Sequence, residues 1–191
     1  MSKSVNNRIA GVVIGQFTGD AFGTTCEFSP ERSAQKTLKA FRVNGFNPIV
    51  GEGPFNLSKG MVTDDTELAC ALMSAIQDVD FDNLEKSLLN GSALNYIMWY
   101  KSHPFDIGNT TRNALCGTSS ADVTARALKN NMGSLSNGCL MRSSPLGILG
   151  HAIDDEDLLK RLIKNDCSLT NPNPICIDGV TCFVFAIRDL I

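Results

Sequence analysis

Apolar residues between Arg8 and Gly23 recur at the three- and four-residue spacing of an amphipathic helix. The apolar positions are Ala10, Val13, Ile14, Phe17 and Ala21. A second face of this helix carries a glycine at every fourth position, at Gly11, Gly15, Gly19 and Gly23. Because glycine lowers helix propensity, such a row is typical of a helix that another backbone approaches closely. The pattern therefore predicts a buried first helix.

The same spacing predicts further helices along the rest of the chain. Their predicted ranges are 31–40, 63–76, 84–90, 92–101, 111–116, 121–130, 154–165 and 178–191, with a helical turn at 145–151. No segment has the pattern of a convincing strand. Two polar stretches are predicted as loops, 24–62 apart from the short helical possibility at 31–40, and 131–144. Long loops in a compact domain are usually functional. The sequence thus predicts an all-α fold, a single compact orthogonal helical bundle over residues 1–191 with long functional loops at one end.

Composition narrows the class of protein. The chain has 191 residues, and 17 lysines and arginines against 20 aspartates and glutamates give a net charge of −3. This balance offers no basic excess for a nucleic-acid partner. No apolar run reaches membrane-spanning length, and the polar N-terminus lacks the features of a secretory signal, so no membrane association and a cytoplasmic, intracellular location are expected.

The most informative short segment is Gly60–Glu67, where two hydroxyls and three carboxylates open an amphipathic helix. In one interpretation Thr63 caps the helix, and Asp64 and Asp65 lie where the helix dipole favours negative charge. In the other, Thr63, Asp64 and Asp65 present hard oxygen ligands for Mg²⁺ or Mn²⁺. Spacing alone leaves both interpretations open.

Three other segments could contribute to a site. Asp106 lies on a loop flanked by proline and glycine. Its carboxylate is either simply solvated or serves to orient a substrate or to transfer a proton. The loop 135–143 consists of small polar residues with one arginine and could hold a diphosphate. Glu27 adds a further carboxylate after the first helix, where a surface position is the simpler interpretation.

The order of these segments resembles the ADP-ribosylglycohydrolase family. The resemblance rests on the glycine-spaced helix ending in Gly19–Gly23 with Glu27 and Phe28 next, then 61–66, 106–111 and 136–142. It implies an all-α, metal-dependent hydrolase that cleaves the glycosidic bond between ADP-ribose and a side chain of an ADP-ribosylated protein. The acceptor residue, whether arginine, serine or poly(ADP-ribose), stays open at this point.

The resemblance also implies roles for individual residues. Thr63, Asp64 and Asp65 would be ligands of a Mg²⁺ or Mn²⁺ site, and Asp106 and Glu27 would be the catalytic carboxylates. The substrate-binding residues would be Asn109, Asn137, Gly138, Met141 and Arg142.

Two departures from the family pattern favour a second hypothesis. The chain lacks the Asp-x-Asp-Thr run that completes the family's two-metal centre, and Asn171 stands where the family commonly has histidine. The acidic group Asp154, Asp155 and Asp157 is interpreted as a helix start rather than as a substitute. The alternative is therefore a catalytically impaired relative that binds ADP-ribose or another protein, with self-association through exposed apolar surface as a further expectation.

Overall fold

The computed structural model describes residues 3–191, and in this part of the chain every element of regular structure is a helix. The elements are α1 (Lys3–Gly23), η1 (Thr24–Cys26), α2 (Glu31–Phe41), α3 (Asp64–Gln77), η2 (Phe81–Asn83), α4 (Leu84–Lys101), α5 (Asn109–Leu115), α6 (Ser120–Asn131), α7 (Ser144–Gly150), α8 (Glu156–Ser168) and α9 (Pro174–Leu190). The prediction of an all-α fold is confirmed. No helix in residues 3–191 has the length and apolar character needed to cross a bilayer.

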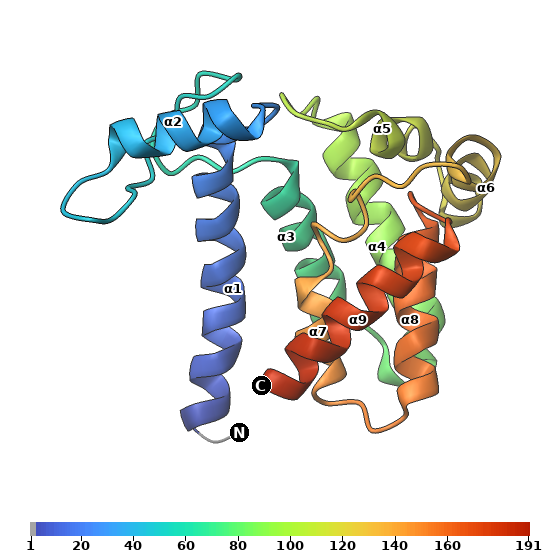
Figure 1. Cartoon of the computed structure of the whole chain (residues 1–191). Helices are drawn as coiled ribbons and strands as arrows, with labels where there is room; N and C mark the ends of the chain where they lie inside the picture. Colours follow the sequence, from blue (N-terminus) through green and yellow to red (C-terminus); the bar gives the residue numbers. More distant parts are fainter. Residues whose placement is uncertain (1–2) are drawn as a thin grey trace.

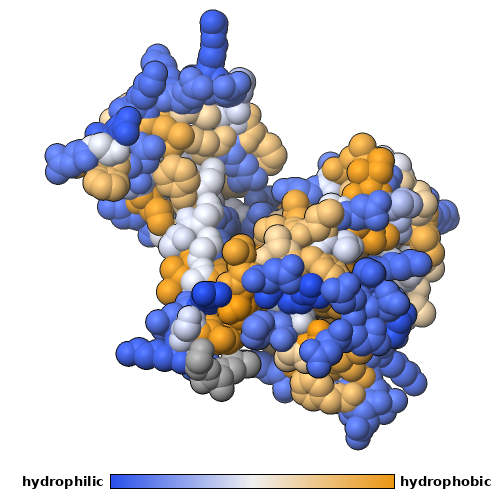
Figure 2. Space-filling model, turned by 60° about the horizontal axis from the view of Figure 1, so that its bottom comes forward, coloured by the Kyte–Doolittle hydropathy of each residue, from blue (hydrophilic) through white to orange (hydrophobic). Residues whose placement is uncertain are grey.

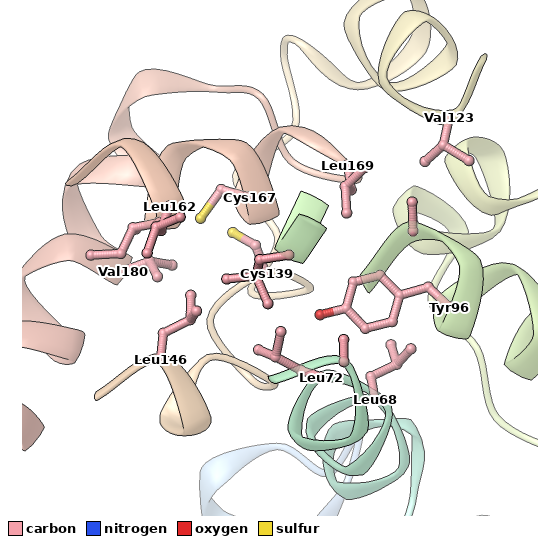
Figure 3. Close-up of a cluster of buried hydrophobic side chains, with 14 of the residues drawn as sticks. Leu68, Leu72, Tyr96, Val123, Cys139, Leu146, Leu162, Cys167, Leu169 and Val180 are labelled. Atoms are coloured by element: carbon pink, nitrogen blue, oxygen red, sulfur yellow. The ribbon is translucent and has the colours of Figure 1, made fainter. Parts of the chain in front are cut away.

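Every α-helix from α3 to α9 contributes buried side chains to the core (Figure 3). Leu68 and Leu72 of α3 face Tyr96 of α4, and Leu146 and Leu162 pack from α7 and α8. All five side chains are buried, and burial of a large apolar side chain stabilises the fold by roughly 1.5–3 kcal/mol. This core fixes the N-terminal end of α3, where the predicted site begins.

The first helix is not buried, and that prediction is wrong. Ala21 is the one buried residue of α1, and a Cβ at Gly11, Gly15 or Gly19 would meet no atom within 4 Å. In Figure 1, α1 stands beside the bundle and does not run through it. The close helix approach lies elsewhere, because a Cβ at Gly147 of α7 would overlap the side chain of Ile187 in α9.

A groove of about 490 Å³ lies between α1 and the bundle. The glycine face of α1 forms one wall, and the other wall includes Leu140, Phe183 and Ile187. Apolar surface gathers in the hollow beside α1 in Figure 2. Arg8 of α1 donates from Nη1 to the backbone oxygen of Leu190, the last residue of α9, at 3.1 Å. Self-association through this surface stays a prediction.

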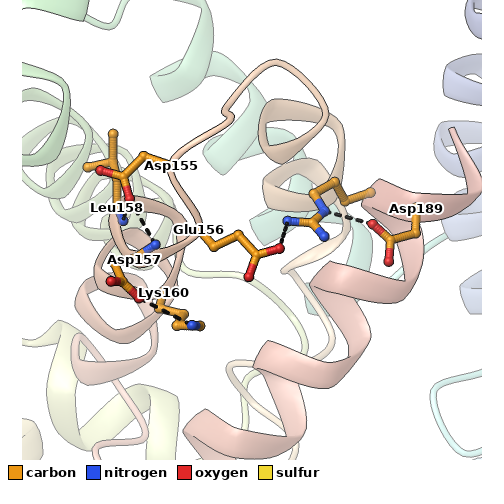
Figure 4. A network of polar contacts seen from close by, with 7 residues as sticks. Asp155, Glu156, Asp157, Leu158, Lys160 and Asp189 are labelled. Carbon is orange, nitrogen blue, oxygen red and sulfur yellow. Dashed lines mark hydrogen bonds and ion pairs between the residues drawn. The ribbon is translucent and has the colours of Figure 1, made fainter.

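Two other details of the sequence pattern are resolved. The helices predicted at 84–90 and 92–101 form one continuous helix, α4. The helix continues through Gly91, which packs against Ala75 of α3. The acidic group at 154–157 opens a helix, as predicted: Asp155 accepts from the backbone N–H groups of Asp157 and Leu158 (Figure 4). Glu156 pairs with Arg188 of α9 at 3.2 Å.

Candidate active site

Asp20, near the end of α1, holds the N-terminus of α3. Its Oδ2 accepts from the backbone N–H groups of Thr63 and Thr66 at 2.9 and 3.1 Å, and its Oδ1 accepts from the Thr63 hydroxyl at 2.9 Å. Thr63 is the N-cap residue by backbone position, but its side chain makes no capping hydrogen bond. The cap is supplied from another helix, and Asp20 is a site residue that the sequence interpretation did not select.

Four carboxylates from three segments line one cavity of about 190 Å³. Asp64 and Asp65 come from the first turn of α3, Glu27 follows η1, and Asp106 comes from the connector before α5. Asp64 is 7% exposed and accepts, at Oδ2, a long hydrogen bond of 3.4 Å from the backbone N–H of Gly108. Residues predicted separately from short motifs thus face a common space.

Burial and mutual repulsion raise the pKa values of these carboxyl groups. Desolvation is the largest cause in each case, followed by a neighbouring negative charge. The pKa rises to about 7 for Glu27 and Asp64, where Asp106 is the main neighbour, and to about 6 for Asp65, where it is Asp20. The pKa of Asp106 is also raised. A bound cation would relieve this repulsion.

The opposite wall of the cavity is polar and largely uncharged. Asn109 begins α5, and Asn137, Gly138 and Met141 lie on the loop before α7. A Cβ at Gly138 would lie 3.1 Å from the Thr111 hydroxyl, a tight contact on the inner side of the loop. Glycine at this position lets the loop pack against α5 while its outer side faces the cavity.

Arg142 lies apart from the other predicted substrate-binding residues. Its side chain is completely buried and lines none of the cavities described here. Its guanidinium group pairs with Asp166 at 3.1 Å, donates to the Gly138 carbonyl at 2.7 Å and lies over the Tyr96 ring. The structure therefore does not support direct contact between Arg142 and a substrate; Arg142 holds the loop from behind.

A turn after α8 anchors the same loop. The side-chain amide of Asn171 donates to the backbone oxygen and the hydroxyl of Ser136 at 3.1 and 3.0 Å. Asn131 donates to the carbonyl groups of Thr110 and Thr170 and so links this turn to the start of α5. These buried amides were not predicted as a support for the site, because their contacts span 21 to 39 residues of sequence.

The donor chemistry fits part of a metal site. Asp64 and Asp65 supply carboxylate oxygens of the kind that Mg²⁺ and Mn²⁺ prefer. Thr63 donates its hydroxyl hydrogen to Asp20, which leaves its oxygen lone pairs as electron donors. Across residues 3–191, however, no three carboxylate, imidazole or thiol side chains converge into a complete metal-binding set. The described residues therefore fit an incomplete site.

Comparison with known proteins decides the family. A family profile described as ADP-ribosylglycohydrolase matches residues 1–191. The chain belongs to the ADP-ribosylglycohydrolase family. The resemblance drawn from the sequence motifs is confirmed. Because the profile spans the whole chain, it includes the four carboxylates that line the cavity, Glu27, Asp64, Asp65 and Asp106.

Individual relatives give the same assignment. A protein of Acanthamoeba polyphaga mimivirus that is named after ADP-ribosyl glycohydrolases is 34% identical over 91% of this chain and 52% of its own length. The ADP-ribosyl-[dinitrogen reductase] glycohydrolase of Rhodospirillum rubrum is 31% identical over 80% of this chain and 49% of its own. An ADP-ribosylarginine hydrolase, Tri1 of Serratia proteamaculans, is 34% identical over 57% of this chain.

A solved structure shows the same fold. The present chain superposes on a chain of the "ADP-ribosylglycohydrolase-related protein complex" with a TM-score of 0.68 and 24% sequence identity. The superposition covers 98% of the present chain and 57% of the solved chain. The present chain spans about half the length of the curated relatives named after glycohydrolases.

Proposed function

We propose that this protein acts on ADP-ribosylated proteins and hydrolyses the glycosidic bond between ADP-ribose and a side chain, with assistance from Mg²⁺ or Mn²⁺. One observation carries the proposal. Of the ten residues selected from the sequence for this chemistry, eight line one cavity of about 190 Å³, although they come from four separate segments. The eight are Glu27, Asp64, Asp65, Asp106, Asn109, Asn137, Gly138 and Met141.

The carboxylates have distinct proposed roles. Asp106 accepts a proton from the water that attacks C1 of the ribose as the bond from C1 to the acceptor side chain breaks. It then gives that proton to the departing acceptor, so the hydroxyl group of the water stays on C1 and its proton ends on the acceptor. Its raised pKa makes the ionised carboxylate a stronger base than an exposed aspartate. Glu27 lies at the edge of the ribose and accepts hydrogen bonds from its hydroxyl groups.

Thr63, Asp64 and Asp65 would hold the cation. A bound Mg²⁺ or Mn²⁺ would orient ribose hydroxyl groups and offset the developing charge. Asn109 and the loop with Asn137, Gly138 and Met141 would lie along the ADP-ribose. Arg142 and Asn171 keep that loop in place from the protein interior, since both donate hydrogen bonds to it.

A second candidate function is binding of ADP-ribose without turnover. It is favoured by the absence of a complete metal-binding set among residues 3–191. This function would use the same cavity and the same loop. The two candidates differ only in whether the bond at C1 is cleaved.

Two measurements on the whole chain test these proposals. Calorimetric titration of ADP-ribose, first with Mg²⁺ and then with chelator, should show binding that is stronger with Mg²⁺. Release of ADP-ribose from a modified protein should then be lost in Asp106→Asn and kept in the control Asp78→Asn, an exposed carboxylate at the other end of α3. Binding without release supports the second candidate, and no binding under either condition refutes both.

A further inference from the structure

A helix beside the acidic cavity carries a row of cations on its outer face. Arg32, Lys36 and Lys39 of α2 follow one another at spacings of four and three residues, so they share one face of the helix. All three are exposed, whereas Ala34 and Phe41 on the opposite face are half-buried. A rise of 1.5 Å per residue makes the row about 10 Å long. The outer face of α2 is therefore a short strip of positive charge.

The segment 31–46, which we call the α2 arm, is basic although the chain as a whole is acidic. The arm contains four basic residues, which are the row and Arg42, and one acidic residue, Glu31, so four minus one gives a net charge of +3. The net charge of the whole chain is −3. The ion pairs found within residues 3–191 involve none of the four cations of the arm. Their charge is therefore available to a partner.

The tip of the α2 arm is a tight turn that displays two apolar side chains. Val43 and Phe46 exchange backbone hydrogen bonds at 2.8 and 2.9 Å. Between them, Asn44 and Gly45 have φ angles of +50° and +84°, both positive as a type I′ turn requires. Val43 is 60% exposed and Phe46 is 78% exposed. An apolar pair that a rigid turn holds in solvent is typical of a surface that binds another protein.

The α2 arm starts at the edge of the acidic cavity. Phe28 lines the cavity, and α2 begins three residues later. Because a chain spans at most about 3.6 Å per residue, the Cα atoms of Phe28 and Arg32 are within about 14 Å of each other. In Figure 1 the far end of α2 points away from the bundle, beyond α1. A macromolecule placed at the cavity would therefore also meet the arm.

The chain that follows the α2 arm returns to the same place. The Thr25 hydroxyl, in η1, donates to the Gly51 carbonyl at 2.9 Å. A Cβ at Gly53 would overlap the carbonyl oxygen of Thr24, so the loop 51–57 presses directly on η1. The arm is thus held against η1 from both ends, and its position relative to the cavity is defined by the fold.

The chemistry of the α2 arm favours an acidic protein surface. Carboxylates on a partner would complement the row of cations, and apolar side chains among them would cover Val43 and Phe46. A folded protein offers both kinds of group on one surface. A nucleic acid would have few phosphates neutralised by a row only about 10 Å long, and the cavity beside the row is lined by four carboxylates.

We propose that the α2 arm docks the ADP-ribosylated substrate protein by binding an acidic patch beside the modified side chain. This inference rests on the proposed function, because the modified side chain must enter the cavity while the rest of the substrate protein stays outside it. The arm then selects among substrate proteins by the charge around the modified residue. It does so without contacting the ADP-ribose.

Two fluorescent peptides test the α2 arm by their anisotropy at about 0.15 M salt. One contains several glutamates around a leucine, and the other has glutamine at each glutamate position; neither is ADP-ribosylated. The wild type should bind the glutamate peptide about tenfold more tightly than the glutamine peptide. Lys36→Glu/Lys39→Glu should remove this preference, because it replaces two attractive charges with repulsive ones. Phe46→Ser should weaken binding of the glutamate peptide severalfold through its leucine contact.

Lys86→Glu/Lys129→Glu is the matched control, since it changes the net charge equally at exposed positions of α4 and α6. The control should bind both peptides as the wild type does. Equal binding of the two peptides by the wild type, or equal losses in the two double variants, overturns the inference. Circular dichroism checks the folding of each variant. Tighter binding of phosphatidylserine vesicles or single-stranded DNA than of the glutamate peptide also overturns it, in favour of a surface for phosphates.

Calorimetric titration of ADP-ribose into the wild type separates this inference from the proposed function. Binding of ADP-ribose without a preference for the glutamate peptide overturns the docking surface alone. A preference for the glutamate peptide that depends on Lys36 and Lys39, without binding of ADP-ribose, overturns the proposed function and supports the arm as a surface for an acidic protein. Binding of ADP-ribose together with that preference supports both.

Discussion

Replacement of Asp64 by asparagine should stabilise the protein in the absence of metal, and more so as the pH rises. The carboxyl group is 7% exposed, and its pKa is raised from 3.8 to about 7 by desolvation and by Asp106 and Asp65. The folded state therefore retains a proton that the unfolded state has released between about pH 4 and pH 7. Stability falls as the pH rises through this window, because a group with a raised folded-state pKa disfavours the ionised folded protein.

The size of the effect follows from the pKa values. One pKa unit corresponds to about 1.36 kcal/mol, so the Asp64 carboxyl group lowers the free energy of unfolding by about 4 kcal/mol at pH 8 but by only about 2 kcal/mol at pH 5. Asparagine keeps an oxygen acceptor for the Gly108 N–H and carries no charge. Its own desolvation does not depend on pH. The difference in unfolding free energy between variant and wild type should therefore grow by roughly 2–3 kcal/mol from pH 5 to pH 8.

Urea unfolding followed by circular dichroism at pH 5, 6.5 and 8, with chelator present, measures this difference. Asp78→Asn is the control, because Asp78 is exposed at the other end of the same helix, and it should follow the wild-type pH dependence. Added Mg²⁺ at pH 8 should stabilise the wild type more than Asp64→Asn. Parallel pH profiles for wild type and Asp64→Asn would refute the argument from repulsion and burial.

Three further predictions concern stability and are measured by urea unfolding at pH 7. Arg142→Met leaves the buried Asp166 carboxylate without its guanidinium partner and should lower the unfolding free energy by about 3–5 kcal/mol; a loss under 1 kcal/mol would contradict the buried network. Gly53→Ala, at a φ of +65° against Thr24, should cost more than about 1 kcal/mol, and a neutral effect would mean that the loop is not pressed on η1. Gly15→Ala should stabilise α1 by roughly 0.5–1 kcal/mol, because its Cβ meets open space; destabilisation would restore the prediction of a close-packed first helix.

Helix periodicity predicted most of the fold because each predicted element carries its own apolar face. Periodicity could not predict how much of α1 is covered in this chain. The apolar and glycine faces of α1 indicate that the helix suits a packed environment, yet the packing partner is a tertiary property. In the described residues, the close helix contact predicted for the first helix occurs instead at Gly147, which packs against Ile187. No spacing rule distinguishes a glycine in such a contact from the glycines of α1, which face open space.

The residues that line the candidate site could be selected from the sequence more readily than the residues that support them. The residues that line the cavity lie in short motifs near helix ends, where polar groups face solvent or a ligand. Their supports, Asp20, Asn131 and Asn171, act on residues 21 to 46 positions away. Arg142 also shows that long-range contacts cannot be predicted from a short motif. Its motif predicted contact with a substrate, but in the folded chain its side chain is buried and paired with Asp166.

Asp20 differs from the other carboxylates of the candidate site in what it does for the fold. Asp20 alone meets the structural need, since it satisfies the backbone N–H groups at the start of α3 and orients Thr63. Asp64 and Asp65 add charge that burial and repulsion make unfavourable, and Glu27 and Asp106 increase that repulsion. A fold that needed only a helix cap would be more stable without them. Because clustered groups with raised pKa values are typical of sites that bind a ligand or cation, the destabilising carboxylates are the residues to examine first for function.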